Sequence, residues 1–117
     1  GKLETGADGH YELITVKPCC YQVPTDGPVG QILRAMGRHA WRPAHLHVIA
    51  SADGYIPVTT MLFDETDPYL DEDAVFGVKD SLVVQFKENT SGDDAEARGV
   101  PAPFFQVEYD IGLMPAA

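Results

Sequence analysis

The stretch that decides the fold is AHLHVIASADGYIPVTTMLF, residues 44–63. Two runs of strand-forming residues, 44–50 and 56–63, flank the dipeptide Asp53-Gly54. An Asp-Gly pair between two such runs is a strong signal of a tight turn. The stretch therefore predicts an antiparallel hairpin.

Further strands are expected on both sides of this hairpin. Residues 3–16 alternate around the turn at residues 7–10 and predict a second hairpin. Residues 81–86 are apolar and strand-like, and residues 104–113 alternate along a last strand. Residues 87–102 are polar and marked by Gly and Pro, so we expect a surface loop there.

One short helix is expected after an ordered loop. Prolines and glycines interrupt residues 18–30, which favours a rigid loop around Tyr21. Apolar residues then recur at helical spacing between a first-turn proline and a capping glycine: Pro28, Val29, Ile32, Leu33, Met36 and Gly37. Together these patterns predict an all-β fold, a β-sandwich with one short helix and long ordered loops, as a single domain over residues 1–117.

Charge and composition exclude several classes of function. The 117 residues carry 18 acidic and 8 basic side chains, a net charge of −10, which disfavours binding to nucleic acid or to an anionic membrane. No apolar run approaches the ~20 residues of a membrane span, and residues 1–10 lack the apolar core of a signal peptide. We therefore expect a soluble, cytoplasmic protein in which the adjacent Cys19 and Cys20 are reduced.

Residues 64–73, DETDPYLDED, hold six carboxylates in ten positions. A calcium loop would use such oxygens, but the fixed ligand spacing around a central glycine is absent. We expect a solvated loop without partner cations, with one helical turn near residues 70–76.

The segment Arg42-Pro43-Ala44-His45-Leu46-His47 carries the most chemical information. Side chains two apart in a strand share a face, so His45 and His47 project together and are able to hold one metal ion. The alternative is a pair of ordinary histidines on the polar face of a strand. His10, in a turn, and His39, after the helix cap, are expected to be structural or solvated.

Tyr21 lies in a loop that its neighbouring prolines and glycine make rigid, and such a loop is able to aim a phenol at a metal. A tyrosine ring packed into the sandwich is the alternative. Because a phenol must lose a proton to become a ligand, a hard, strongly polarising cation is required, and ferric iron fits better than zinc.

Two segments, YQVPTDGPVGQILRAMGRHAWRPAHLH (residues 21–47) and GYIPVTTMLFDETDPYLDEDAVFGVKDSLVV (residues 54–84), closely resemble the intradiol ring-cleavage dioxygenases. This family includes the catechol, chlorocatechol and hydroxyquinol 1,2-dioxygenases. The resemblance extends from about Lys2 to Leu113. It implies an oxidoreductase of aromatic catabolism that uses non-haem Fe(III) and O₂ to open a catechol-type ring to a dicarboxylic acid, maleylacetate or a muconate.

The resemblance also implies roles for individual residues. Tyr21 matches the axial tyrosinate that substrate displaces, and His45 and His47 match the equatorial and axial histidine ligands. Arg42 matches the arginine that stabilises the ketonised substrate anion.

Two departures from the family pattern limit these roles. The family's equatorial tyrosinate would fall before residue 1, so we expect the chain to be the catalytic part of a longer enzyme that lacks N-terminal segments here. With one tyrosinate and one hydroxide a ferric ion keeps a net charge of +1, which predicts weak iron binding by this chain alone. Met61 stands where most relatives carry a glutamine, and methionine cannot donate that hydrogen bond.

Substrate choice rests on analogy with the family. Val23, Pro24 and Val75 would line the ring pocket, and the sequence around Val75 favours hydroxyquinol, an aromatic triol, over catechol, a diol. Family members commonly form homodimers through an N-terminal helical segment, which leaves the oligomeric state open. Two other classes compete: a non-catalytic β-sandwich binding module or inactive relative, and a zinc hydrolase built on His45 and His47.

Overall fold

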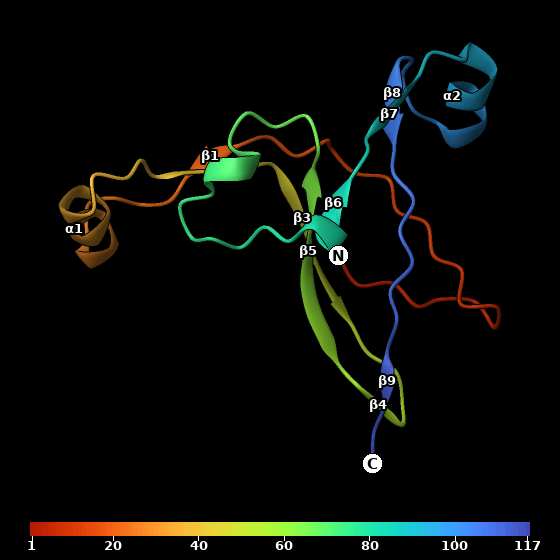
Figure 1. Ribbon diagram of the computed structural model, residues 1–117. Coiled ribbons are helices and arrows are strands. Elements are labelled where there is room, and N and C mark those ends of the chain that lie inside the picture. The colour runs from red at the N-terminus through yellow and green to blue at the C-terminus, as the bar shows by residue number, and fades with distance from the viewer.

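A three-stranded sheet forms the centre of the computed structural model, which describes residues 1–117 (Figure 1). Its strands are β3 (His45–Ala50), β5 (Val58–Asp64) and β6 (Val83–Val84), in the order β3-β5-β6. β3 and β5 pair antiparallel over six residue pairs, whereas β6 runs parallel to the end of β5. The hairpin predicted from residues 44–63 is therefore confirmed.

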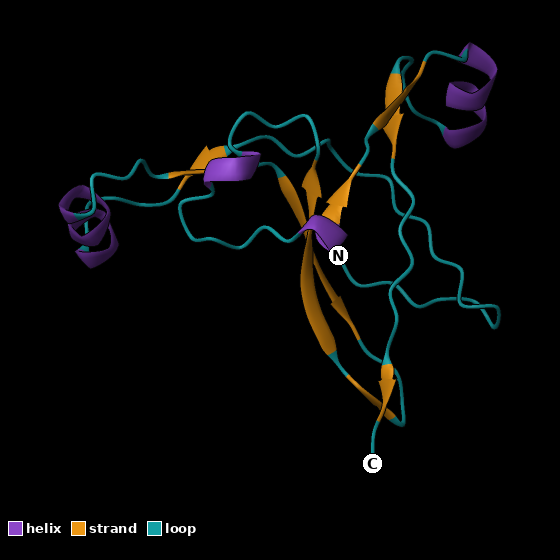
Figure 2. Ribbon diagram, in the orientation of Figure 1, coloured by secondary structure: helices purple, strands orange, loops and turns teal.

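Three two-stranded ladders surround this sheet, and Figure 2 shows long connections between them. They pair β1 (Tyr21–Gln22) with β2 (Trp41–Arg42), β4 (Tyr55–Ile56) with β9 (Met114–Pro115), and β7 (Lys87–Asn89) with β8 (Phe104–Gln106). All three ladders are antiparallel, and each joins segments that are far apart in the chain. β4 lies between β3 and β5 in the chain, at the tip of the central hairpin.

The predicted helix is α1 (Pro28–Ala35), which begins at its proline. Gly37 follows it at a φ of 65°, a left-handed conformation that glycine adopts without strain. The helical turn predicted in the acidic segment is the 3₁₀ helix η1 (Leu70–Glu72), and a second 3₁₀ helix, η2 (Asp80–Leu82), precedes β6. No helix in the structure has the length and hydrophobicity that crossing a bilayer requires.

A second α-helix, α2 (Gly92–Arg98), lies where a surface loop was predicted. The Ser91 side chain accepts a hydrogen bond from the backbone N–H of Asp94, and Gly99 ends the helix at a φ of 67°. These are ordinary helix-capping signals. The prediction was wrong because it weighted the polar composition of the segment above its caps.

The hairpin predicted over residues 3–16 is also wrong. The turn exists, with the Gly9 N–H donating to the Gly6 carbonyl at 3.0 Å, but no strand flanks it. Leu13 and Val16 are each more than half exposed, and alternation produces a strand only where a neighbouring strand completes the ladder. Of the last predicted strand, residues 104–113, only β8 at its start forms, and β9 follows after its end. Cys19 and Cys20 form no disulfide with each other.

The buried core is narrow and centres on the end of β5. Only 12 of 117 residues are buried, and Phe63 is fully so, at 0% exposure. The radius of gyration is 17.2 Å, against roughly 13 Å for a compact domain of this length. The predominance of strands agrees with the predicted all-β class, with two short helices in place of one, and the sandwich itself stays a prediction.

We expect Phe63→Ala to lower the free energy of unfolding by about 3–5 kcal/mol, because it removes a fully buried ring from this core. Phe105→Ala is the matched control, since Phe105 is 46% exposed and should cost less than half as much. Urea denaturation of the two variants checks the expectation. Equal losses would contradict a core centred on Phe63.

Candidate metal and substrate site

Tyr21 and Arg42 are brought together by the β1–β2 ladder, in which they are directly opposed. Arg42 Nη1 donates to the Tyr21 hydroxyl oxygen at 3.4 Å. The tyrosine is 43% exposed, so its ring is not packed into a core.

His45 lies at the start of β3, and its ring centroid is 5.7 Å from that of Tyr21. Its Nδ1 is 2.9 Å from the Pro43 carbonyl oxygen. A carbonyl only accepts hydrogen bonds, so in the neutral imidazole Nδ1 carries the proton and Nε2 carries the lone pair. This is the tautomer that a metal-binding histidine requires at Nε2. The Phe63 ring, at 5.5 Å, packs on the same imidazole.

His47 is two residues further along β3, and strand alternation places it on the same face as His45. It is exposed, and its ladder partner on β5 is Met61. The Met61 sulfur lies 3.7 Å from Arg42 Nη2, as a weak acceptor. The Met61 side chain therefore only accepts a hydrogen bond from Arg42. A glutamine at this position would be able both to accept and to donate a hydrogen bond.

A buried ion pair fixes the guanidinium of Arg42. Its Nε donates to Asp73 Oδ1 at 3.0 Å and its Nη2 to Asp73 Oδ2 at 3.2 Å, with exposures of 8% for Arg42 and 4% for Asp73. The hydrogen bond to Asp73 raises the pKa of Arg42. Burial by itself would raise the pKa of Asp73, but hydrogen bonds from Arg42, Gly77 and Val75 outweigh it and hold that pKa below its ordinary value.

The acidic segment is solvated only in part. Glu65, Asp71 and Glu72 are exposed, as predicted, whereas Asp64 and Asp73 are buried. Asp64 is 2% exposed and forms an ion pair with Lys17, and Asp67 Oδ2 accepts from the Ala44 N–H at 2.9 Å. The partner cations, Lys17 and Arg42, lie outside the segment, so its local composition did not reveal them. Asp73 is the residue that sequence reasoning missed, and the signal for it was an arginine just before a predicted strand that required a counter-ion.

The other residues predicted for the substrate pocket are Val23, Pro24 and Val75. Val23 follows β1 and donates its N–H to the Ala40 carbonyl at 3.0 Å, with Pro24 next in the chain. Val75 is 47% exposed and donates its N–H to Asp73 Oδ1 at 3.3 Å. The loop that carries Val75 is therefore anchored on the carboxylate that holds Arg42.

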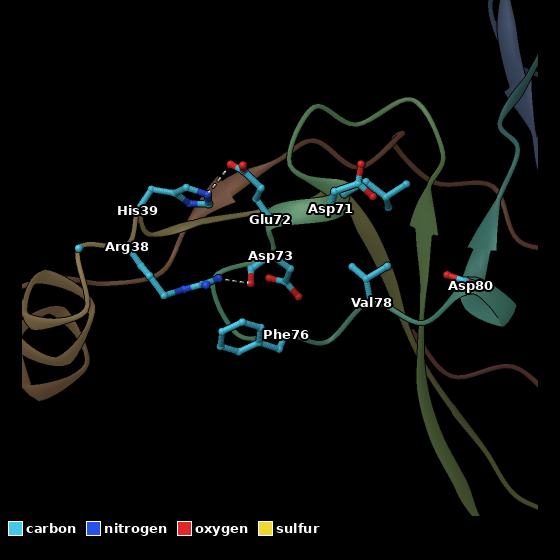
Figure 3. A pocket seen from close by; sticks show the side chains of 10 residues that line it. Arg38, His39, Asp71, Glu72, Asp73, Phe76, Val78 and Asp80 are labelled. Atoms are coloured by element: carbon cyan, nitrogen blue, oxygen red, sulfur yellow. Dashed lines mark hydrogen bonds and ion pairs between the residues drawn. The ribbon is translucent and has the colours of Figure 1, made fainter.

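A pocket of about 510 Å³ lies beside the main chain of Asp73 (Figure 3). None of the predicted metal ligands lines it. His39, on its rim, accepts the Trp41 N–H at Nδ1 and lies 3.5 Å from Glu72, so it has the structural role expected for it. The candidate site is instead the open surface that Tyr21 and His45 form beside Arg42.

No group of three or more His, Cys, Asp and Glu side chains lies close enough together to hold a metal ion. A zinc site on His45 and His47 would need a third ligand of this kind.

Residues 1–115 match a protein-family model described as Dioxygenase. The chain belongs to the intradiol ring-cleavage dioxygenase family. It is 48% identical over 114 residues to hydroxyquinol 1,2-dioxygenase of Rhizobium sp. (strain MTP-10005), covering 97% of this chain and 39% of that protein. It is 49% identical over 115 residues to 6-chlorohydroxyquinol 1,2-dioxygenase of Cupriavidus pinatubonensis, covering 98% of this chain and 38% of that protein.

Among solved structures, hydroxyquinol 1,2-dioxygenase from Pseudomonas putida DLL-E4 superposes with a TM-score of 0.74 at 48% identity. The match covers 86% of this chain and 35% of that one. The chain thus spans somewhat over a third of the length of the relatives it matches.

Asp64 and Asp73 are expected to make the folded protein lose stability in acid. The pKa of each carboxyl lies below 3.8 in the folded state, so as the pH falls the unfolded chain binds protons first. Their stabilising contribution is complete above about pH 4 and is lost as the pH falls toward the folded pKa.

Urea denaturation between pH 3 and pH 6 measures this loss. Asp73→Asn should flatten the decline of the free energy of unfolding below about pH 4. The control is Asp71→Asn, which removes an exposed carboxylate and should keep the decline of the parental protein. An unchanged decline in Asp73→Asn would contradict the assignment.

Proposed function

We propose that the protein takes part in intradiol ring cleavage of a catechol-type substrate, with non-haem Fe(III) and O₂, and that residues 1–117 contribute catalytic strands of a β-sandwich. The observation that carries the proposal is the convergence of Tyr21, His45 and Arg42 at one open surface. The names of the relatives support the reaction class, since they are hydroxyquinol and 6-chlorohydroxyquinol 1,2-dioxygenases.

The residues at this surface fit a ferric ion. The Nε2 lone pair of His45 is free because Nδ1 donates to Pro43, and the Tyr21 ring lies 5.7 Å from the imidazole. His47, exposed on the same strand face, is the third proposed ligand. When bound, Fe(III) would supply Lewis-acid polarisation of the two substrate oxygens and would orient the ring.

Each side chain has a defined task in the proposed reaction. The Tyr21 Oη atom takes up a proton from one substrate hydroxyl, for which its exposure gives it room. Arg42 stabilises the negative charge that develops on the ring as its two hydroxylated carbons are separated and both atoms of O₂ are inserted. The ion pair with Asp73 keeps that guanidinium desolvated and oriented before substrate arrives.

Hydroxyquinol is the proposed substrate, which would give maleylacetate. Val23, Pro24 and Val75 are the proposed pocket residues, and all three come from segments that flank Tyr21 or Asp73. Two of the relatives carry hydroxyquinol or its chlorinated form in their names.

One observation favours a second candidate, a non-catalytic relative. Met61 directs only a weakly accepting sulfur at Arg42, so the polar environment of the site differs from one that contains a glutamine. Such a protein would keep the scaffold and neither bind iron tightly nor consume O₂.

Removal of the proposed ligands tests the iron site. We expect Tyr21→Phe to lower both iron content and turnover, and His47→Ala to abolish iron binding, because each removes one ligand of a small set. His10→Ala, which removes an exposed histidine in a turn, is the control and should keep the parental iron content.

Metal analysis and visible absorption of the purified proteins measure the outcome. The parental protein, expressed from its complete coding sequence, should be wine-red from tyrosinate-to-ferric charge transfer, and Tyr21→Phe should lose intensity in that band. Full iron content in His47→Ala would reject the ligand assignment.

Turnover with labelled oxygen tests the reaction itself. With hydroxyquinol and ¹⁸O₂, mass spectrometry of the product should find both labelled atoms in one ring-opened acid. We expect kcat/KM to be at least ~10-fold higher for hydroxyquinol than for catechol, since a site that hydrogen-bonds an extra hydroxyl discriminates against its absence. Consumption of neither substrate by the parental protein would support the non-catalytic alternative.

A further inference from the structure

Asp73 receives more hydrogen bonds than one ion pair requires. Its Oδ1 accepts from Arg42 Nε at 3.0 Å and from the Val75 N–H at 3.3 Å. Its Oδ2 accepts from Arg42 Nη2 at 3.2 Å and from the Gly77 N–H at 2.8 Å. One buried carboxylate thus joins the arginine of the candidate site to the backbone of residues 75–77.

This arrangement requires a carboxylate. All four partners are donors, so both side-chain oxygens must accept. An asparagine has the same shape but only one oxygen, and its NH₂ group would face two donors. In either orientation of the amide, Asp73→Asn would therefore lose one hydrogen bond from the guanidinium and one from the backbone of the loop.

Gly77 lies close to the same guanidinium. A Cβ atom at this position would lie 2.9 Å from Arg42 Nη2, 3.0 Å from Asp73 Oδ2 and 3.6 Å from Met61 Cε. Contacts below 3.0 Å force one partner to shift. A side chain at residue 77 would push the arginine away from the carboxylate, and no positive φ contributes to this requirement.

A second arginine, Arg38, also contacts this loop (Figure 3). Arg38 Nη2 donates to the Asp73 carbonyl at 3.0 Å, and its guanidinium carbon lies 4.0 Å from the centroid of the Phe76 ring. Phe76 has a φ of 57°, which side chains other than glycine rarely adopt. The loop conformation is thus held both by the Asp73 carboxylate and by Arg38.

We propose that Asp73 is a positioning residue that holds Arg42 against Tyr21, and that Gly77 leaves the space this position needs. Through the Val75 and Gly77 amides, the same carboxylate couples the position of the arginine to the loop that carries a proposed substrate contact. The inference rests on the proposed function, and it assigns to that site two residues that do not themselves touch substrate.

Steady-state kinetics with hydroxyquinol test the inference, using the iron-loaded protein expressed from its complete coding sequence. Asp73→Asn and Gly77→Ala should each lower kcat by ~10- to 100-fold, since a displacement near 1 Å has effects of this size. KM should change less than ~3-fold and iron content should be unchanged, because neither residue is a ligand. Asp71→Asn, an exposed charge change on η1, should keep the parental kcat.

A double-variant comparison separates positioning from general structural damage. In an Arg42→Ala background, Asp73→Asn should change kcat less than ~2-fold, because the group through which it acts is already gone. Crystal structures of the iron-free variants provide a readout apart from turnover. They should show Arg42 Nη1 withdrawn from Tyr21 Oη beyond hydrogen-bond distance in both Asp73→Asn and Gly77→Ala.

The parental kcat in Asp73→Asn, or an equal loss of kcat with and without Arg42, would overturn the inference. An Arg42 side chain that keeps its position in both iron-free variants would do the same. A parental protein that turns over no catechol-type substrate would contradict the proposed function, and the crystallographic comparison would still decide the positioning role.

Discussion

The ion pair between Arg42 and Asp73 is the interaction on which the candidate site depends. Both residues are almost completely buried, in a structure where few residues are. Removing one partner of such a pair leaves an uncompensated charge and typically costs about 3–5 kcal/mol. Because the guanidinium also contacts Tyr21 and Met61, the pair sets where a positive charge lies beside these two residues.

The acidic segment holds the start of β3 at several further points. Asp67 Oδ2 accepts from the Ala44 N–H, and the Asp64 N–H donates to the Ala44 carbonyl at 3.1 Å. The Ala74 N–H donates to the Trp41 carbonyl at 3.1 Å. These bonds fix the chain immediately before His45, and the Pro43 carbonyl within it sets the imidazole tautomer. The acidic segment and Ala74, directly after it, therefore hold the chain that carries the proposed ligands, through one carboxylate and two backbone hydrogen bonds.

Local signals predicted part of this fold correctly. The central hairpin and α1 were found because a turn dipeptide, a proline and helical spacing act within a few residues. The hairpin over residues 3–16 failed because alternation describes a strand face and does not supply the neighbouring strand that a ladder needs. Asp73 was missed because its partner lies 31 positions earlier in the chain, beyond any local pattern. The proximity of Tyr21 to His45 agrees with their predicted grouping, whereas metal ligation stays a prediction.

The account's central claim is that the phenol of Tyr21 and the imidazoles of His45 and His47 meet at one ferric ion beside Arg42. An anomalous difference map from crystals of the iron-loaded protein, collected at the iron absorption edge, tests it most directly. The account predicts a single peak in direct contact with Tyr21 Oη and with Nε2 of both histidines. A peak elsewhere, or one that touches the histidines with the tyrosine directed away before substrate is added, would contradict it.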